Sequence, residues 1–184
     1  MKFLIGFILG LVVIPVGLYF YFSTGSVPVA TSAQPMPFEK RMANMALDAR
    51  VKKEAPSTVP IPANDANYIA GAQIYQQNCA VCHGLPGQQP NAIAKGMFPK
   101  PPQLFHGKGV TDDPTQETYW KAANGIRLTG MPGFKGSLSD DQLWQVSLLL
   151  ANADKLPAQA LAALNGSSVA PTETTPAPKS GHKK

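Results

Sequence analysis

The only two cysteines of this 184-residue chain stand three positions apart, and a histidine directly follows the second: Cys79, Cys82 and His83. Two thiols at this spacing support one of three kinds of chemistry. They form a redox disulfide, they hold half of a zinc site, or they bond to the two vinyl groups of a haem. The surrounding sequence discriminates among these possibilities.

Two of the three chemistries lack the partners they need. A redox dithiol usually sits near a strand-helix-strand pattern, and we find no such series. Structural zinc takes four Cys or His ligands, but the remaining histidines, His106 and His182, offer no second pair. Haem explains every residue of the motif, since thioethers from Cys79 and Cys82 would fix the macrocycle and His83 would bind its iron. We therefore predict one covalently bound haem.

A haem that only carries electrons needs a second axial ligand, and methionine is a common one. Four of the six methionines lie upstream of the predicted domain: Met1, Met36, Met42 and Met45. Met131 stands in a Thr-Gly-Met-Pro-Gly loop, where glycine permits close backbone approach and proline stiffens the chain. We expect Met131 to be the ligand, with Met97 as its main competitor and His106 as a third candidate. If neither methionine binds, the iron is open to small molecules.

Two helices are expected to bracket the first part of the site. A helix over 65–78 would deliver Cys79 at its end, with apolar residues at helical spacing on one face. A second helix is predicted from Asp113 to about Asn124, because Asp113 is a good N-cap and Pro114 suits the first helical position. Between them, glycines and prolines crowd 84–114 and exclude long regular elements. Such a loop is either disordered or wraps something that supplies a core.

A third helix has the clearest start signal in the chain. Ser139 and Gln142 have the spacing of a capping box, and an apolar face follows them up to about Asn152. All three helices fall within one predicted domain over 63–156.

The first 22 residues predict a membrane helix. Residues 3–22 carry no charge, and at about 1.5 Å per residue they reach roughly the 30 Å of a bilayer core. A cleaved signal peptide is the alternative, but its apolar stretch is usually shorter, about 7 to 15 residues. We expect a retained anchor.

The flanking segments are expected to differ in order. Residues 23–62 read as a tether that contains a short amphipathic helix over 38–54, whose stripe of Phe38, Met42, Met45 and Ala49 we expect to pack within the chain. Residues 157–184 are of low complexity and are expected to be a disordered tail.

The net charge of +5 lies in these flanks. Within 60–156 the charges balance: Lys95, Lys100, Lys108, Lys121, Arg127, Lys135 and Lys155 against Asp65, Asp112, Asp113, Glu117, Asp140, Asp141 and Asp154. A neutral domain does not support nucleic-acid binding. Solvated lysines are the ordinary interpretation of Lys95, Lys100, Lys121 and Lys135, although these four could also ring an exposed haem edge.

Three runs of residues carry a resemblance to a known family: Tyr75 to Gly84, Asn124 to Phe134 and Asp140 to Trp144. Over roughly 65–156 the sequence resembles a bacterial, membrane-anchored class I monohaem c-type cytochrome. The resemblance implies a small all-α class I cytochrome c fold around one haem c. It also implies that Gly71 and Tyr75 on the first helix meet Trp144 on the last.

The function that follows is electron transfer without catalysis. We predict a non-enzymatic carrier of single electrons between respiratory redox partners, free or as a subunit of a membrane complex, with no small-molecule substrate. The haem domain is expected on the periplasmic side of the cytoplasmic membrane. Within it, the loop over 101–104, with Pro101, Pro102 and Leu104, would pack on the porphyrin. The alternative is a haem enzyme or gas sensor with an open distal site, for which His106 would be the acid-base group.

Overall fold

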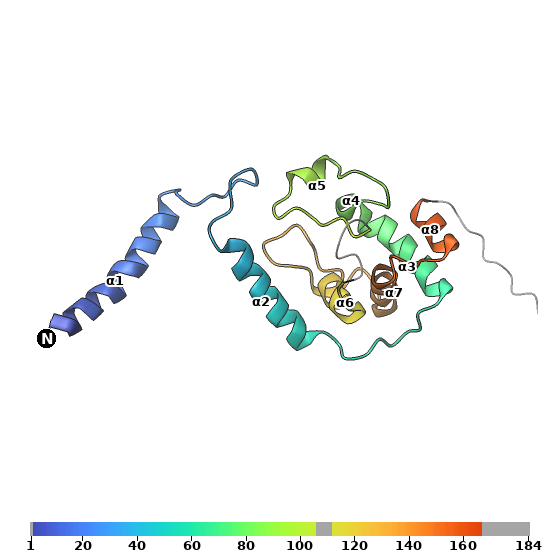
Figure 1. The fold of residues 1–184 in the computed structure, drawn as a ribbon, viewed down its shortest axis with the longest axis horizontal. Coiled ribbons are helices and arrows are strands. Elements are labelled where there is room, and N and C mark those ends of the chain that lie inside the picture. The colour runs from blue at the N-terminus through green and yellow to red at the C-terminus, as the bar shows by residue number, and fades with distance from the viewer. Residues whose placement is uncertain (1, 106–111, 167–184) are drawn as a thin grey trace, which may run out of the picture.

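The computed structural model describes residues 2–105 and 112–166. Every regular element within these ranges is a helix, which confirms the all-α prediction (Figure 1). The helices are α1 (Lys2–Ser23), α2 (Glu39–Glu54), α3 (Asp65–Asn78), α4 (Ala80–His83), α5 (Ala92–Gly96), α6 (Thr115–Asn124), α7 (Asp140–Ala151) and α8 (Ala158–Leu164).

Helices α3 and α7 cross in close contact at the centre of the domain (Figure 1). The contact is possible because Gly71 of α3 has no side chain. A Cβ at this position would collide with the backbone carbonyl oxygen of Gln145 in α7 and would lie 3.2 Å from the Cβ of Leu149. Both helices begin where their sequences predict, since Asn64 caps α3 and Ser139 forms the expected capping box with Gln142.

Two groups of buried side chains lie on either side of this crossing. The first joins α3, α7 and α8 through Ala72, Ile74, Tyr75, Val146, Leu149, Ala163 and Leu164. The second joins α6 and α7 through Tyr119, Ala123, Leu143 and Trp144. The Trp144 ring stacks on Tyr119 at 4.0 Å, and the Tyr75 ring packs edge-on against Phe105. The expected meeting of Tyr75 with Trp144 is therefore wrong, because each ring has another aromatic partner in a separate cluster.

Helix α6 starts one residue later than predicted. Pro114 occupies the N-cap, with an extended backbone and no side-chain cap bond, and Thr115 is the first helical residue. The Asp113 carboxylate instead accepts a 2.6 Å bond from the Lys121 ammonium group two turns along the helix. A salt bridge to this lysine has displaced the predicted capping role.

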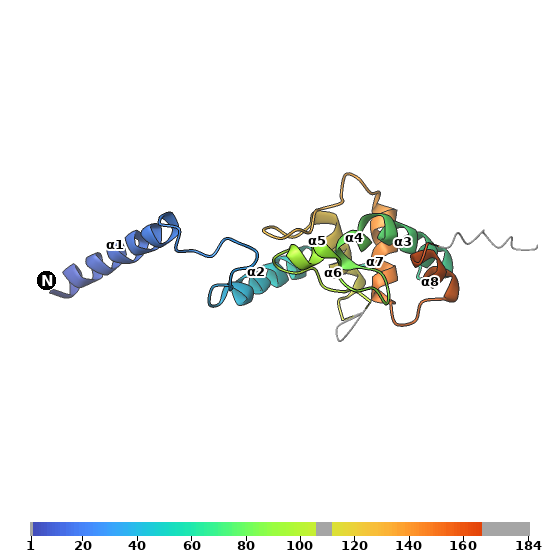
Figure 2. The same ribbon diagram turned by 90° about the horizontal axis from the view of Figure 1, so that it is seen from above.

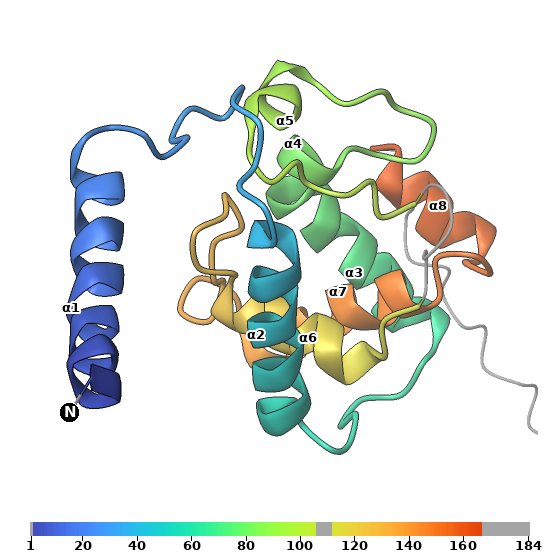
Figure 3. The same ribbon diagram turned by 60° about the vertical axis from the view of Figure 1, so that its left-hand side comes forward.

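Helix α2 forms where it is expected, but the opposite face packs. The stripe predicted to be covered remains in solvent, since Phe38 is 71% exposed and Met42 and Met45 are each 63% exposed. Val51 is the buried residue of α2, with 1% exposure. Apolar residues lie on both faces of this helix. Helical periodicity therefore predicts that the larger apolar stripe packs, although the smaller one does. Figure 3 shows α2 lying across α6.

The predicted disordered tail is wrong for its first residues. Residues 158–164 form α8, which packs on α3 and buries Ala160, Ala163 and Leu164. The composition looked featureless because small alanines, rather than large apolar residues, make most of this contact. The rest of the predicted tail, from 167 on, lies outside the described residues.

Helix α1 stands apart from the domain (Figures 1 and 2). Its stretch Gly6–Ser23 is long and apolar enough to cross a membrane. It packs against no other helix among those described, and its described side chains are almost all exposed. Nothing inside the described part of the chain covers this apolar surface, as expected for an anchor.

Candidate functional site

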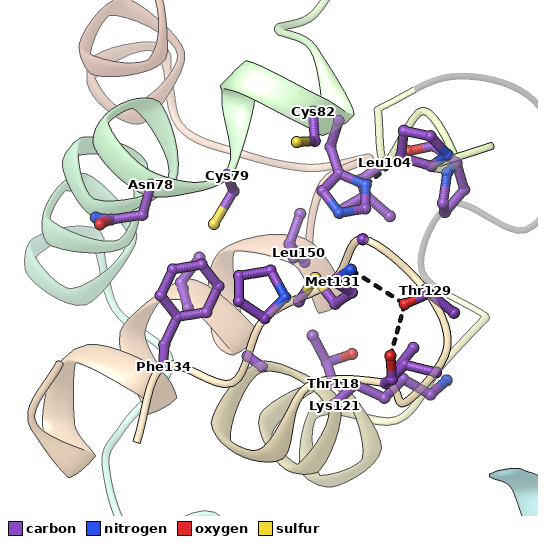
Figure 4. Close-up of a pocket in the computed structure, with 18 of the residues that line it drawn as sticks. Asn78, Cys79, Cys82, Leu104, Thr118, Lys121, Thr129, Met131, Phe134 and Leu150 are labelled. Atoms are coloured by element: carbon purple, nitrogen blue, oxygen red, sulfur yellow. Dashed lines mark hydrogen bonds between the residues drawn. The ribbon is translucent and has the colours of Figure 1, made fainter. Parts of the chain in front are cut away.

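A cavity of about 420 Å³ opens between α4, α6, α7 and the two loops that flank α6 (Figure 4). Its lining is mostly apolar, and it includes the motif residues Cys79, Cys82 and His83. Both candidate methionines, Met97 and Met131, line the same cavity. The fold thus brings Met131 to the same cavity as Cys79, which precedes it by 52 positions in the sequence.

The end of α3 positions the two cysteines. The helix closes with a bond from the Cys79 amide to the Tyr75 carbonyl, 2.8 Å long. The chain then turns directly into α4, where the His83 amide donates to the Cys79 carbonyl at 2.9 Å. In Figure 4 both thiol groups lie on the same side of the cavity, above the loop that carries Met131. The two sulfur atoms form no disulfide, and burial, with Cys82 nearby, raises the pKa of the Cys79 thiol to about 12.

The orientation of His83 is set by one hydrogen bond. Its Nδ1 lies 2.8 Å from the backbone carbonyl of Pro102. Because a carbonyl only accepts, Nδ1 carries the proton and Nε2 keeps its lone pair. Burial lowers the pKa of His83, although the Pro102 bond opposes this shift. A neutral ring with a free Nε2 is the state that a metal requires.

Two further residues hold the backbone of the motif. The Tyr75 hydroxyl donates to the Gly84 carbonyl at 2.7 Å, and the Gln103 side-chain amide donates to the His83 carbonyl at 2.9 Å. Burial raises the pKa of Tyr75 above its ordinary range, so the hydroxyl keeps its proton. Sequence reasoning missed both roles. No local signal marks them, because each bond joins a side chain to a carbonyl at least nine residues away.

The loop that carries Met131 is tied to itself and to α6. The Thr129 hydroxyl donates to the Ile126 carbonyl at 2.7 Å and accepts from the Met131 amide at 3.0 Å, while the Ile126 amide donates to the Met131 carbonyl at 3.1 Å. Gly125 closes the loop with φ 69°, and a Cβ there would meet the Met131 carbonyl oxygen at 2.8 Å. The Met131 backbone is therefore fixed on both sides.

Met97 also reaches the loop that carries Met131. Its side chain reaches Gly130, where an added Cβ would collide with the methionine methyl group. No hydrogen bond of the Met97 backbone is found in the described chain. The third candidate, His106, lies outside the described residues.

Other predicted contacts fall partly at the cavity. Pro101, Pro102 and Leu104 line it, as expected for the loop that would pack on a porphyrin. Of the four lysines, Lys100 and Lys121 contribute to the lining. Lys95 and Lys135 do not line the cavity, so the four lysines form no complete ring around it. The ammonium group of Lys121 pairs with Asp113.

The residues present fit a covalent haem. Two thiols at the required spacing and a neutral histidine with a fixed ring stand beside a mainly apolar cavity that also contains a thioether side chain. Bound here, the group would supply an iron centre that gains and loses one electron.

Known proteins are similar to this chain over the residues that form the site. The family described as Cytochrome C oxidase, cbb3-type, subunit III matches residues 66–148. The chain is 37% identical over 91 residues to cytochrome c6 of Leptolyngbya boryana and covers 98% of that protein.

Larger proteins contain a segment similar to this chain. The chain is 38% identical over 85 residues to the cytochrome c subunit of alcohol dehydrogenase (quinone) from Gluconobacter oxydans. It is 26% identical over 123 residues to quinohemoprotein alcohol dehydrogenase ADH IIB of Pseudomonas putida. In both cases the chain spans only 16% of the relative's length.

Proposed function

The chain belongs to the monohaem c-type cytochromes, and from that premise we propose that it is a membrane-tethered carrier of single electrons with a His/Met-ligated haem. Cys79 and Cys82 form the thioether bonds. His83 and Met131 are the two axial ligands. The observation that carries this proposal is the convergence of these four side chains on one cavity.

Met131 is favoured over Met97 by its backbone. A ligand that is held in place before the iron binds loses little conformational entropy on binding, and the same geometry serves both oxidation states. Hydrogen bonds on both sides of Met131 provide that rigidity. No backbone hydrogen bond of Met97 itself is found within the described chain. Ligation by methionine and histidine raises the reduction potential.

An absorption spectrum tests the ligand assignment. Ferric haem with a sulfur ligand shows a weak far-red band, which should be present in the wild type and absent from Met131→Ala. The matched variant Met97→Ala should keep the band. Loss of the band only in Met97→Ala would show that Met97 is the ligand. Ready binding of carbon monoxide to the ferrous wild type would instead support an open distal site, and with it a haem enzyme or gas sensor.

We further propose that the carrier works at the periplasmic face of the cytoplasmic membrane with redox proteins as partners. Helix α1 supplies the tether, and confinement to one surface raises the effective concentration of partners there. Two relatives named as alcohol dehydrogenases contain a similar segment, which supports a place in a larger oxidoreductase complex. Co-purification from membranes in mild detergent would identify the partners, and recovery of the chain alone would favour a free carrier.

A further inference from the structure

One residue of the cavity lining comes from the chain before the segment that the family matches. Leu47 of α2 lines the cavity together with Thr118, Lys121 and Ala122, although the family match begins only at residue 66. We propose that α2 is a lid on the haem site, which excludes water from one side of the haem and thereby raises its reduction potential. This inference rests on the proposed function, since it requires a haem in the cavity.

Helix α2 is attached to the domain by a narrow seam, which consists of Leu47, Val51 and Glu54. Leu47 and Val51 are one turn apart, and Glu54 follows three residues later, so all three lie on one face of the helix. Leu47 is half-buried and Val51 is 1% exposed. The Glu54 carboxylate accepts a 3.3 Å bond from the Trp120 indole of α6 and also pairs with Arg50 at 2.7 Å. These contacts fix α2 with Leu47 towards the cavity.

The opposite face shows that this docking is selective. At 3.6 residues per turn, Met45 lies roughly 160° around the helix from Leu47. Met45, Met42 and Phe38 form the larger apolar surface, yet they remain mostly exposed. General apolar attraction would have turned this larger surface inward. The smaller face packs instead because it fits the cavity and the indole of Trp120.

Shielding by Leu47 has a definite electrostatic direction. Oxidised haem carries one more positive charge than reduced haem, and water stabilises the more charged form. Exclusion of water therefore favours the reduced form and raises the potential, since solvent exposure is one of the features that set it. Truncation of Leu47 would open this side of the cavity and lower the potential.

Redox titration of the full-length protein with its haem tests the lid. Leu47→Ala should shift the midpoint potential to lower values, whereas Leu47→Met, which keeps nearly the same volume, should restore most of the wild-type potential. Met45→Ala removes a similar side chain from the opposite face of α2 and should leave the potential unchanged. The far-red band should persist in all three variants, because none of them touches the proposed ligands.

Detachment of the whole helix provides a second test. Val51→Asp would place a charge in the buried seam, so α2 should leave the domain. The potential should fall at least as far as in Leu47→Ala, and added protease should cut within 39–54 faster than in the wild type. Wild-type potentials in both Leu47→Ala and a protease-sensitive Val51→Asp would overturn the lid. A wild type without haem or without the far-red band would overturn the proposed function instead.

Discussion

At the scale of single residues, Gly71 sets the distance between α3 and α7. Gly71→Ala would force a methyl group against the backbone of Gln145, and a backbone cannot yield as a flexible side chain does. Overpacking costs about 1–3 kcal/mol and occasionally more, which exceeds the gain of about 0.5–1 kcal/mol from alanine in a helix. We expect a lower free energy of unfolding, measured by chemical denaturation of the haem-loaded protein.

Gly96 offers the matched control for this substitution. It also lies in a helix, α5, but a Cβ there would meet nothing within 4 Å. Gly96→Ala should leave stability unchanged or raise it slightly. If both alanine variants behaved alike, close approach of the two helices would not be the reason for glycine at position 71.

Because of Tyr119, we expect the stability of the fold to decrease at alkaline pH. Burial, with help from the Asp140 carboxylate that accepts its hydroxyl at 2.7 Å, raises the pKa of Tyr119 from 10.0 to about 12. Between pH 10 and 12 the unfolded chain therefore loses this proton before the folded chain does. Stability falls over that window, by on the order of 2 kcal/mol at about 1.4 kcal/mol per pKa unit. Below pH 10 this group has no effect on the slope.

Tyr119→Phe isolates that effect. At pH 7 the variant should be less stable by about 0.5–1.5 kcal/mol, because it lacks the hydrogen bond to Asp140. As the pH rises from 10 to 12, the difference from the wild type should shrink and then reverse, since the wild type loses on the order of 2 kcal/mol over this window and phenylalanine has no proton to lose. Urea denaturation at pH 7, 10 and 12 measures it. A constant difference at all three values would contradict the raised pKa.

At the scale of secondary structure, α8 is part of the core although the sequence there looked like a tail. Leu164 is fully buried against α3, so Leu164→Ala should cost about 2–5 kcal/mol of unfolding free energy. Leu161 on the same helix is 39% exposed, and Leu161→Ala should cost clearly less. Equal and small losses in both variants would mean that α8 does not dock on α3.

Elements with local signals could be predicted from the sequence, and those set by distant partners could not. The capping box of Ser139 and the helix that ends at Cys79 depend on neighbours within four residues, and both were found. The docked face of α2 depends on the cavity and on Trp120, 66 residues away from Glu54. The start of α6 differs from the prediction because the Asp113 carboxylate pairs with Lys121 and does not cap the helix.

In the candidate site, too, local signals predict some residues, whereas others are identified only by the fold. Cys79, Cys82 and His83 form a motif that is readable from its spacing, and the structure places them at one cavity. The carbonyl of Pro102 and the hydroxyl of Tyr75 support the motif through bonds that span 19 and 9 positions. Nothing in the sequence distinguishes Pro102 and Tyr75 from the other prolines and tyrosines, so only the folded structure identifies these roles.

At the scale of the whole molecule, α1 and the haem domain are separate units joined by 24–38. Because α1 packs on no other described helix, replacement of α1 by a cleavable export signal should release a soluble domain with an unchanged absorption spectrum. The native chain should stay in the membrane fraction after a high-salt wash and leave it only with detergent. Comparison of the two fractions by haem absorbance measures both outcomes.

The side of the membrane can be tested on the same protein. The linker over 24–38 has no helix and carries few side-chain bonds, so an added protease should cut it. If the domain lies at the periplasmic face, as proposed, protease added to spheroplasts with an intact inner membrane should release a haem-containing fragment into the medium. Retention of the whole chain until the cells are lysed would place the domain inside. A mature N-terminus downstream of residue 23 would show a cleaved signal peptide in place of the anchor.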